Sequence, residues 1–387
     1  MRLLFVNGHM RVGGGEKSLL DLLTHLDYDK YQVDLLLTEG KGEYFDMLPP
    51  QVRVRVVETG HVYGTLGKSL LANLRAGRLW AIYYRLVLLL SHWFGKRALC
   101  LLMPIFALFR HYDCAIAYRP GSCADIVAHS IRARRRICWW HNGKVDYSAT
   151  GIREVDATWR HFDEVVTVSQ GCKQMLAEHF SFPADRIVVI PNMIDADRIR
   201  RLAGNSSPYP DDSKLHLVTV GRLSPEKRVD NALRAARQLL DEGFQPFCWH
   251  IIGDGALMGK LKALASELNL GDSIDFLGNQ SNPYPYIKFA DLLVHTSHVE
   301  SQSIVLLEAM ALRVPCVATC SLGPQEFLSN QVNGILVDKD ITSLVNGIKL
   351  SIVSDQDNRI ALVENAFETT KHFLPSTIVH QFENLAH

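Results

Sequence analysis

Residues 291–319 read DLLVHTSHVESQSIVLLEAMALRVPCVAT. The pattern predicts a strand over Leu292–His295, a loop, a helix and a second buried strand. Glu300 falls in the loop and Glu308 in the helix, with seven residues between them. Ser303 is the expected cap of this helix, because its hydroxyl can accept a bond from a free helix N–H. Two carboxylates and a helix N-terminus beyond a strand end favour a ligand with hydroxyl and phosphate groups.

The spacing of the two glutamates is weak evidence alone, but the whole block resembles the signature of the retaining family 4 glycosyltransferases, which have the GT-B fold. Where the family has Glu-Gly, this chain has Glu300-Ser301, and where it has Gly before the second strand this chain has Leu312-Arg313. We expect the first departure to alter how the loop meets a donor phosphate, and the second to alter only a turn. The resemblance is to enzymes of bacterial surface polysaccharide assembly.

That resemblance implies a retaining transferase that moves a sugar from a nucleoside diphosphate to an acceptor hydroxyl. The nucleotide sugar is the substrate, and no further cofactor or metal is implied. Glu308 would hold the ribose hydroxyls and Glu300 the hydroxyls of the transferred sugar. The departing phosphate would deprotonate the acceptor. Donor contacts are implied for Ser301, Gln302, Ser303, Ile304, Gly14, Gly15, Gly253 and Gly278.

The length of 387 residues and a hydrophobic content of 47% favour two α/β domains with their own cores. Apolar strands alternate with helical segments in both halves. We place the first domain at 1–195 and the second, nucleotide-sugar-binding domain at 212–374, because the stretch Gly204–Lys214 is rich in Ser, Pro and Asp. The family arrangement is two Rossmann-like domains facing each other across a cleft, with the last helix, 375–387, returning to the first domain.

Composition excludes some functions. The net charge is zero, so nucleic acid is not an expected partner. The eight cysteines show no metal-ligand spacing and suggest reduced, buried thiols in a cytoplasmic protein. Leu3–Val6 is too short for a signal peptide.

Two cations follow the first strand of the second half. Arg222 and Lys227 lie five residues apart in the segment VGRLSPEKR. A guanidinium and an ammonium suit the oxygens of a diphosphate, and the family uses both to neutralise the leaving group. The alternative is a solvated turn with ordinary surface charges.

Two features of the first half fit the same reading. Gly13-Gly14-Gly15-Glu16 resembles the family's Gly-Gly-x-Glu loop at the donor–acceptor junction, although a flexible loop is the alternative. His141 ends a predicted strand, where the family has a His near the transferred sugar; a structural His is equally compatible. Ser169 is an expected helix cap.

Two Asp-x-Asp triplets, 195–197 and 338–340, resemble the metal site of the other glycosyltransferase fold. We expect neither to bind metal, since the first caps a helix and the second follows a strand. Two other functions remain open. A nucleotide-sugar epimerase would need an acid/base pair that the sequence does not offer. A non-catalytic sugar-binding protein would not need the diphosphate cations.

The span from Glu58 to Asp113 contains no acidic residue between its ends but has seven cations and several aromatic residues. Its apolar runs are too short to cross a bilayer. We expect residues 68–110 to lie on the cytoplasmic face of a membrane, where the acceptor would be a lipid-linked glycan precursor. The alternative is a pair of core helices with a basic outer face.

Overall fold

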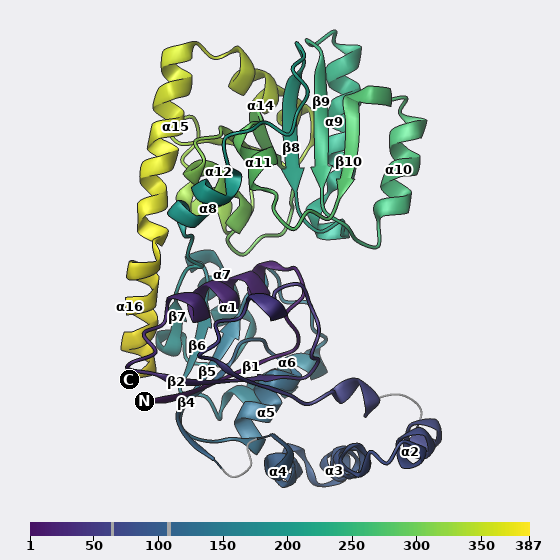
Figure 1. The fold of residues 1–387 in the computed structure, drawn as a ribbon, viewed down its shortest axis with the longest axis vertical. Helices are drawn as coiled ribbons and strands as arrows, with labels where there is room; N and C mark the ends of the chain where they lie inside the picture. The colour runs from purple at the N-terminus through teal and green to yellow at the C-terminus, as the bar shows by residue number, and fades with distance from the viewer. Residues whose placement is uncertain (63–65, 107–109) are drawn as a thin grey trace. The chain divides into compact units, whose positions relative to one another are not determined.

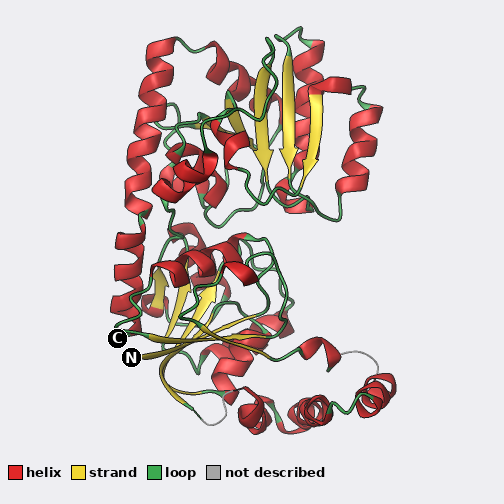
Figure 2. Cartoon of the chain, viewed as in Figure 1, coloured by secondary structure: helices red, strands yellow, loops and turns green. Residues whose placement is uncertain are grey.

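The computed structural model describes residues 1–62, 66–106 and 110–387. Its contacts divide the chain into two compact units, each a parallel sheet with helices on its faces (Figure 1, Figure 2). The two Rossmann-like α/β domains are therefore confirmed. Unit 1 comprises Met1–His141, Val145–Ile190 and Ile378–His387, and unit 2 comprises Asn142–Lys144 and Pro191–Thr377.

The sheet of unit 1 has seven strands in the order β3-β2-β1-β4-β5-β6-β7. Most of its inner strands are buried on both faces, which explains their nearly continuous apolar sequence, whereas the edge strand β3 is mostly exposed. They are β1 (Arg2–Asn7), β2 (Gln32–Leu37), β3 (Arg53–Val56), β4 (His111–Ala117), β5 (Arg132–Trp140), β6 (Glu164–Thr167) and β7 (Ile187–Val189). The β5 strand begins at Arg132, and its first half is rich in arginines at the exposed end of the sheet.

The helices of unit 1 lie between these strands. They are α1 (Gly14–His25), α2 (Leu66–Arg75), α3 (Leu79–Phe94), α4 (Met103–Phe106), α5 (Ser122–Ser130), α6 (Ala149–Trp159) and α7 (Gln170–His179), with short 3-10 helices η1 (Phe45–Met47), η2 (Thr59–His61), η3 (Lys96–Leu102) and η4 (Ala184–Arg186). Ser169 caps α7 as predicted, accepting a bond from the Cys172 N–H at 3.3 Å.

The sheet of unit 2 has six strands in the order β10-β9-β8-β11-β12-β13. They are β8 (Leu215–Val220), β9 (Phe247–Ile252), β10 (Ile274–Gly278), β11 (Leu292–His295), β12 (Cys316–Thr319) and β13 (Ile335–Val337). The helices are α8 (Ala196–Ala203), α9 (Val229–Asp241), α10 (Met258–Glu267), α11 (Tyr284–Lys288), α12 (Ile304–Ala311), α13 (Pro324–Phe327), α14 (Ile341–Val353) and α15 (Gln356–Thr370), with η5 (Pro225–Lys227), η6 (Gly271–Ser273) and η7 (Lys371–Phe373).

The division of the chain falls between Ile190 and Pro191, five residues before the boundary placed from the sequence. The segment after Asp195, which the sequence left outside both domains, is part of unit 2. It forms α8, whose Ile199 and Ala203 are buried in the same core cluster as Leu306.

The last helix, α16 (Pro375–Ala386), belongs to unit 1 from Ile378 onward, together with the terminal His387. Phe382 is fully buried there, with its ring 5.8 Å from that of Phe5 and 6.1 Å from that of Trp139. A hydrogen bond of 3.1 Å joins the Tyr31 hydroxyl and Nε2 of His387. These contacts complete one face of the first sheet.

Candidate active site

The topology of the second sheet brings two loops together. The strand order reverses at β8 and β11, and ligands of open α/β sheets bind outside the carboxyl ends of strands at such a switch. The loop after β8 carries Lys227 and the loop after β11 carries Glu300. The Thr296 hydroxyl donates to the Lys227 carbonyl at 2.8 Å, and the His298 N–H donates to the Glu226 carbonyl at 3.0 Å. These bonds hold the two loops side by side.

Lys227 and Glu300 form an ion pair between Nζ and Oε1. Nε2 of His295, at the end of β11, lies 3.1 Å from the same oxygen. Burial by itself raises the pKa of Glu300, but the charge of Lys227 and the contact with His295 outweigh it and hold this pKa well below its usual range. Glu300 is therefore an ionised acceptor of hydrogen bonds and not a proton donor. Nothing in the sequence marks His295 as a site residue, since a His in an apolar strand usually fills core space.

Ser303 does not cap α12 through its side chain, so that prediction is wrong. A capping residue is normally extended, whereas Ser303 has φ +69° and ψ 81°, in the left-handed region. Its Oγ instead lies 3.0 Å from Nε2 of His295. The serine thus belongs to the network around Glu300.

Glu308 lies within α12 and is 5% exposed. The hydroxyl of Tyr284, on α11, donates to Oε1 of Glu308 at 3.0 Å. This bond fixes the orientation of the carboxylate that the sequence assigns to a ribose. Nothing in the sequence links Tyr284 to it, because the contact depends on how α11 packs on α12.

Arg222 is exposed in the loop after β8. Within the described part of the chain, its guanidinium has no hydrogen-bond or ion-pair partner. Arg222 and Lys227 thus differ: the first points a charge to solvent, while the second is already matched with Glu300.

The predicted glycines hold the ends of three strands close together. Gly253 has φ +137°, and a Cβ there would lie 2.0 Å from the carbonyl oxygen of Gly221. The Gly253 N–H donates to the carbonyl of Gly278 at 2.7 Å, and Gly278 has φ +68°. Side chains at these positions would force the loops after β8, β9 and β10 apart.

The remaining predicted donor contacts lie around the start of α12. Gln302 is 2% exposed, and its amide bonds both backbone groups of Asn192, accepting at 2.6 Å and donating at 3.2 Å. Its side chain therefore fixes the loop to the segment that contains Asn192. Ser301 is half-buried, and Ile304 is the first residue of α12.

Three predicted residues lie in unit 1. Gly14 begins α1, and a Cβ on Gly15 would lie 3.6 Å from the His141 ring. That ring lies 4.8 Å from the ring of Tyr118. Burial, and then the charge of Arg119, lower the pKa of His141 to about 3, so the imidazole is neutral at physiological pH. Its Nε2 is buried and has no hydrogen-bond partner among the described residues.

The Asp-x-Asp triplets serve as helix caps. Asp195 caps α8, as predicted, by accepting from the Arg198 N–H at 2.8 Å. Asp340 caps α14 by accepting from the Ser343 N–H at 2.8 Å. Across residues 1–62, 66–106 and 110–387, no group of three or more His, Cys, Asp or Glu side chains is arranged to hold a metal ion.

Comparison with known families supports the assignment from these residues. Residues 12–198 match the model described as Glycosyltransferase Family 4, and residues 206–369 match the model described as Glycosyl transferases group 1. The two matches together include every site residue described above. The chain belongs to the family 4 glycosyltransferases.

Proteins similar to this chain include an uncharacterized glycosyltransferase of Methanocaldococcus jannaschii, 24% identical over 59% of each chain. Another is the N-acetylgalactosamine-N,N'-diacetylbacillosaminyl-diphospho-undecaprenol 4-alpha-N-acetylgalactosaminyltransferase of Campylobacter jejuni, 28% identical over 50% of this chain and 52% of the relative. The matches span 59%, 23% and 54% of the length of the first three curated relatives.

Solved structures of GT-B glycosyltransferases have the same fold over the whole chain. The Anabaena protein HepE, in complex with UDP and glucose, has a TM-score of 0.72 at 21% identity, covering 100% of this chain and 99% of HepE. Staphylococcus aureus TarM has a TM-score of 0.73 at 14% identity, covering 100% and 98%. At these identities the likeness establishes the GT-B fold.

Proposed function

We propose that this chain is a retaining glycosyltransferase that transfers a hexose-type sugar from a nucleoside diphosphate to a hydroxyl of a glycan or lipid-linked acceptor. The observation that carries the proposal is the ion pair between Lys227 and Glu300 at the switch point of the second sheet, in the same loop as Arg222, whose guanidinium has no partner among the described residues. Lys227 supplies a cation for the leaving diphosphate, and Glu300 supplies a carboxylate for the sugar hydroxyls. The donor site of a glycosyl transfer needs both groups close together, because the diphosphate is bonded directly to the sugar.

In this mechanism the diphosphate contacts Arg222 and Lys227, and the sugar hydroxyls donate to Glu300. The bond from the anomeric carbon to the diphosphate oxygen breaks, and the acceptor oxygen bonds to that carbon on the same face. The acceptor proton passes to the departing phosphate oxygen. Negative charge grows on the diphosphate as the bond breaks, so the two cations stabilise the transition state more than the ground state. This route needs neither a protein nucleophile nor a metal.

His141 and the nucleotide pocket complete the proposed roles. For neutral His141, with Gly14 and Gly15 beside it, the proposed role is a contact with the transferred sugar. Glu308, oriented by Tyr284, would accept bonds from the vicinal ribose hydroxyls. Gly253 and Gly278 would admit the nucleotide close to the backbone. Because HepE holds UDP in its crystal structures, UDP sugars are the first donors to test.

The test is thermal unfolding of the full chain with a panel of UDP, GDP and ADP sugars. A ligand present at 100 times its Kd stabilises the folded state by about 2.7 kcal/mol, which gives a clear shift in Tm. We expect one nucleotide series to stabilise the protein and to release nucleoside diphosphate over time. If no nucleotide sugar shifts the Tm of the protein, the proposed donor site is wrong.

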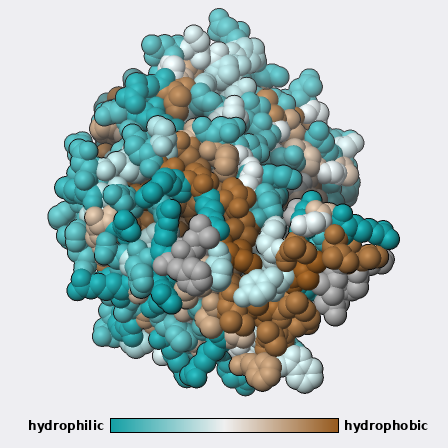
Figure 3. All heavy atoms as spheres, turned by 60° about the horizontal axis from the view of Figure 1, so that its bottom comes forward, coloured by the Kyte–Doolittle hydropathy of each residue, from teal (hydrophilic) through white to brown (hydrophobic). Residues whose placement is uncertain are grey.

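The proposed location is a membrane surface, reached through α2, α3 and α4. One face of α3 is apolar and solvent-exposed, with Leu79 68%, Leu86 48% and Trp93 81% exposed; Phe94, at the helix end, is 76% exposed. Figure 3 displays apolar side chains gathered on this side of unit 1. Trp and Leu on one helix face suit the interface of a bilayer. Residues 107–109 of the predicted segment lie outside the described residues.

The charges of this segment differ from the sequence prediction in one respect. Lys96 donates to Asp125 at 2.8 Å and to the Thr158 hydroxyl at 3.0 Å, and Arg85 donates to the Val62 carbonyl at 2.8 Å. These cations stabilise unit 1, so replacing them would not test membrane binding cleanly. Arg97 is exposed and remains available to an anionic surface. None of the helices in the described residues has the length and apolar character to cross a bilayer.

Sedimentation with anionic and zwitterionic vesicles tests this location. We expect W93S and F94S to reduce binding to both vesicle types, because these side chains supply apolar contact, and R97Q to reduce only the salt-sensitive part. V353S is the matched control, since Val353 is 75% exposed on unit 2. Absence of binding to either vesicle type would refute the membrane location while leaving the donor site untouched.

A further inference from the structure

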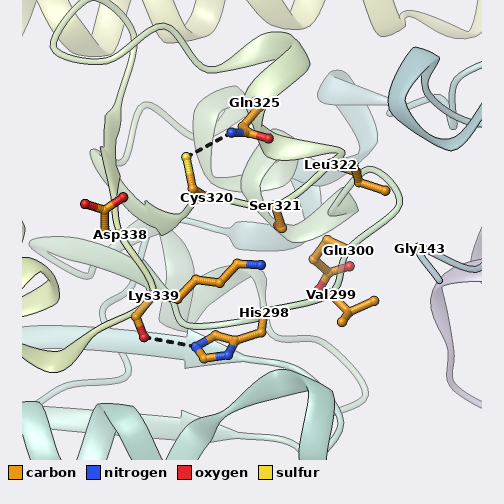
Figure 4. A pocket seen from close by; sticks show the side chains of 10 residues that line it. All are labelled: Gly143, His298, Val299, Glu300, Cys320, Ser321, Leu322, Gln325, Asp338 and Lys339. Atoms are coloured by element: carbon orange, nitrogen blue, oxygen red, sulfur yellow. Dashed lines mark hydrogen bonds between the residues drawn. The ribbon is translucent and has the colours of Figure 1, made fainter. Parts of the chain in front are cut away.

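A cavity of about 540 Å³ opens beside Glu300 in unit 2 (Figure 4). It lies at the carboxyl ends of β11, β12 and β13, where the chain leaves each strand. Its volume is within the range of small-ligand pockets. The lining residues are Gly143, His298, Val299, Glu300, Cys320, Ser321, Leu322, Gln325, Asp338 and Lys339.

One buried group in this cavity has no partner. Ser321 is 6% exposed, and its Oγ makes no hydrogen bond among the described residues. Figure 4 shows Ser321 at the centre of the lining, between Glu300 and the ammonium of Lys339. Buried hydroxyls in folded proteins are nearly always hydrogen-bonded, so the position points to a polar ligand.

The lining offers hydrogen-bond donors and acceptors, and it carries charges of both signs. Lys339 supplies an ammonium, Asp338 and Glu300 supply carboxylates, and Gln325 supplies an amide. An anion would meet the two carboxylates and a cation would meet Lys339, which disfavours either as the main occupant. A neutral molecule whose hydroxyls both donate and accept satisfies all of these groups.

The place of the cavity in the sheet gives its role. The proposed diphosphate contacts and the two glycine turns follow β8, β9 and β10, and Glu308 on α12 bonds Tyr284 of α11, whereas the cavity lies at the ends of β11, β12 and β13. Glu300 stands between them. A molecule in the cavity therefore lies beyond the transferred sugar, away from the nucleotide.

We propose that this cavity is a subsite for a neutral sugar residue of the acceptor glycan, with Ser321 and Lys339 as its specificity-determining contacts. The inference rests on the proposed function, because it places the transferred sugar at Glu300. It adds that unit 2 recognises part of the acceptor as well as the donor.

Cys320 provides a direct measure of occupancy, because its thiol lines the cavity and accepts a bond from the Gln325 amide at 3.1 Å. The full chain carrying C100S and C248S leaves Cys320 as the accessible thiol, since the other described cysteines are buried. The rate of its reaction with N-ethylmaleimide is followed with and without cellobiose or N,N′-diacetylchitobiose. A saccharide at ten times its Kd should slow the reaction about tenfold.

Two site variants and an anion control decide the result. S321A and K339A should weaken this protection, while stabilisation by the nucleoside diphosphate stays, because neither side chain lies on the nucleotide side. Protection by sodium sulfate but not by saccharides would indicate an anion site and overturn the inference. Unchanged labelling with every saccharide, in protein that still binds nucleoside diphosphate, would overturn it as well. If the unsubstituted chain does not bind nucleoside diphosphate at all, that result would instead count against the proposed function.

Discussion

Nε2 of His295 lies within 3.1 Å of Oε1 of Glu300, and the same nitrogen lies 3.0 Å from Oγ of Ser303. The imidazole therefore links the loop carboxylate to the first turn of α12. We predict that H295N lowers kcat about tenfold to a hundredfold, since small misplacements of a sugar-binding group have effects of this size. Binding of the bare nucleoside diphosphate should change little, because its contacts lie elsewhere.

Steady-state kinetics and calorimetry on the same preparation separate a positioning role from a folding role. If H295N lowers the Tm and weakens nucleoside diphosphate binding by the same factor as it lowers kcat, His295 serves only to stabilise the core. S303G is a useful companion, because glycine accepts the left-handed backbone of this position and removes only the hydroxyl contact.

The two cations of the β8 loop should both matter for turnover. We predict that R222A and K227A each lower kcat by at least about a hundredfold, as loss of a transition-state charge partner does. K227A should also raise the pKa of Glu300, because the Lys227 ammonium stabilises the ionised form of that carboxylate. K260A, an exposed lysine on α10, is the matched control. Full activity in the double variant would rule out the diphosphate assignment.

The two glutamates should separate in a binding experiment. We predict that E308Q weakens binding of the bare nucleoside diphosphate, whereas E300Q leaves it nearly unchanged and lowers turnover or relaxes sugar choice. Y284F should weaken nucleotide binding in the same direction as E308Q, because it removes the bond that orients Glu308. Isothermal titration calorimetry is the measurement. Equal losses in E300Q and E308Q would contradict the division of roles.

Metal removal gives a further prediction. The proposed leaving group already meets Arg222 and Lys227, so initial rates should be the same before and after incubation with EDTA. Loss of activity in EDTA with recovery in Mg²⁺ or Mn²⁺ would show that a metal supplies the charge instead.

Stability should depend on pH through His129, a half-buried residue of α5. Burial, and then the charge of His161, lower its pKa to about 4, while the unfolded chain keeps an ordinary value of about 6.5. Between these values the unfolded state binds a proton that the folded state does not, so the free energy of unfolding falls as pH falls through this window. We predict that H129Q flattens this part of a urea-unfolding pH series. H372Q, at an exposed position, should leave it as in the natural chain.

The sequence predicted most of the second sheet, because parallel strands are buried on both faces and read as apolar runs. The observed β11 has the predicted bounds, Leu292–His295. The switch-point loops followed from the motif that contains Glu300.

The features that the sequence predicted wrongly or did not reveal depend on backbone conformation and on tertiary packing. Ser303 has a left-handed backbone that no local pattern marks. The Tyr284–Glu308 bond joins two helices, and the partners of Arg85 and Lys96 come from elsewhere in unit 1. The site roles of Arg222, Lys227 and Glu300 stay predictions until the variants above are measured.

The last helix, α16, also sets an order of events during protein synthesis. Phe382 fills the space beside Phe5 and Trp139, yet it leaves the ribosome only after all of unit 2 has been made. At 5–20 residues per second this delay is roughly 10–40 s. For that time the nascent first sheet has an uncovered aromatic patch, so chaperone binding to the N-terminal half should end when the final ten residues emerge.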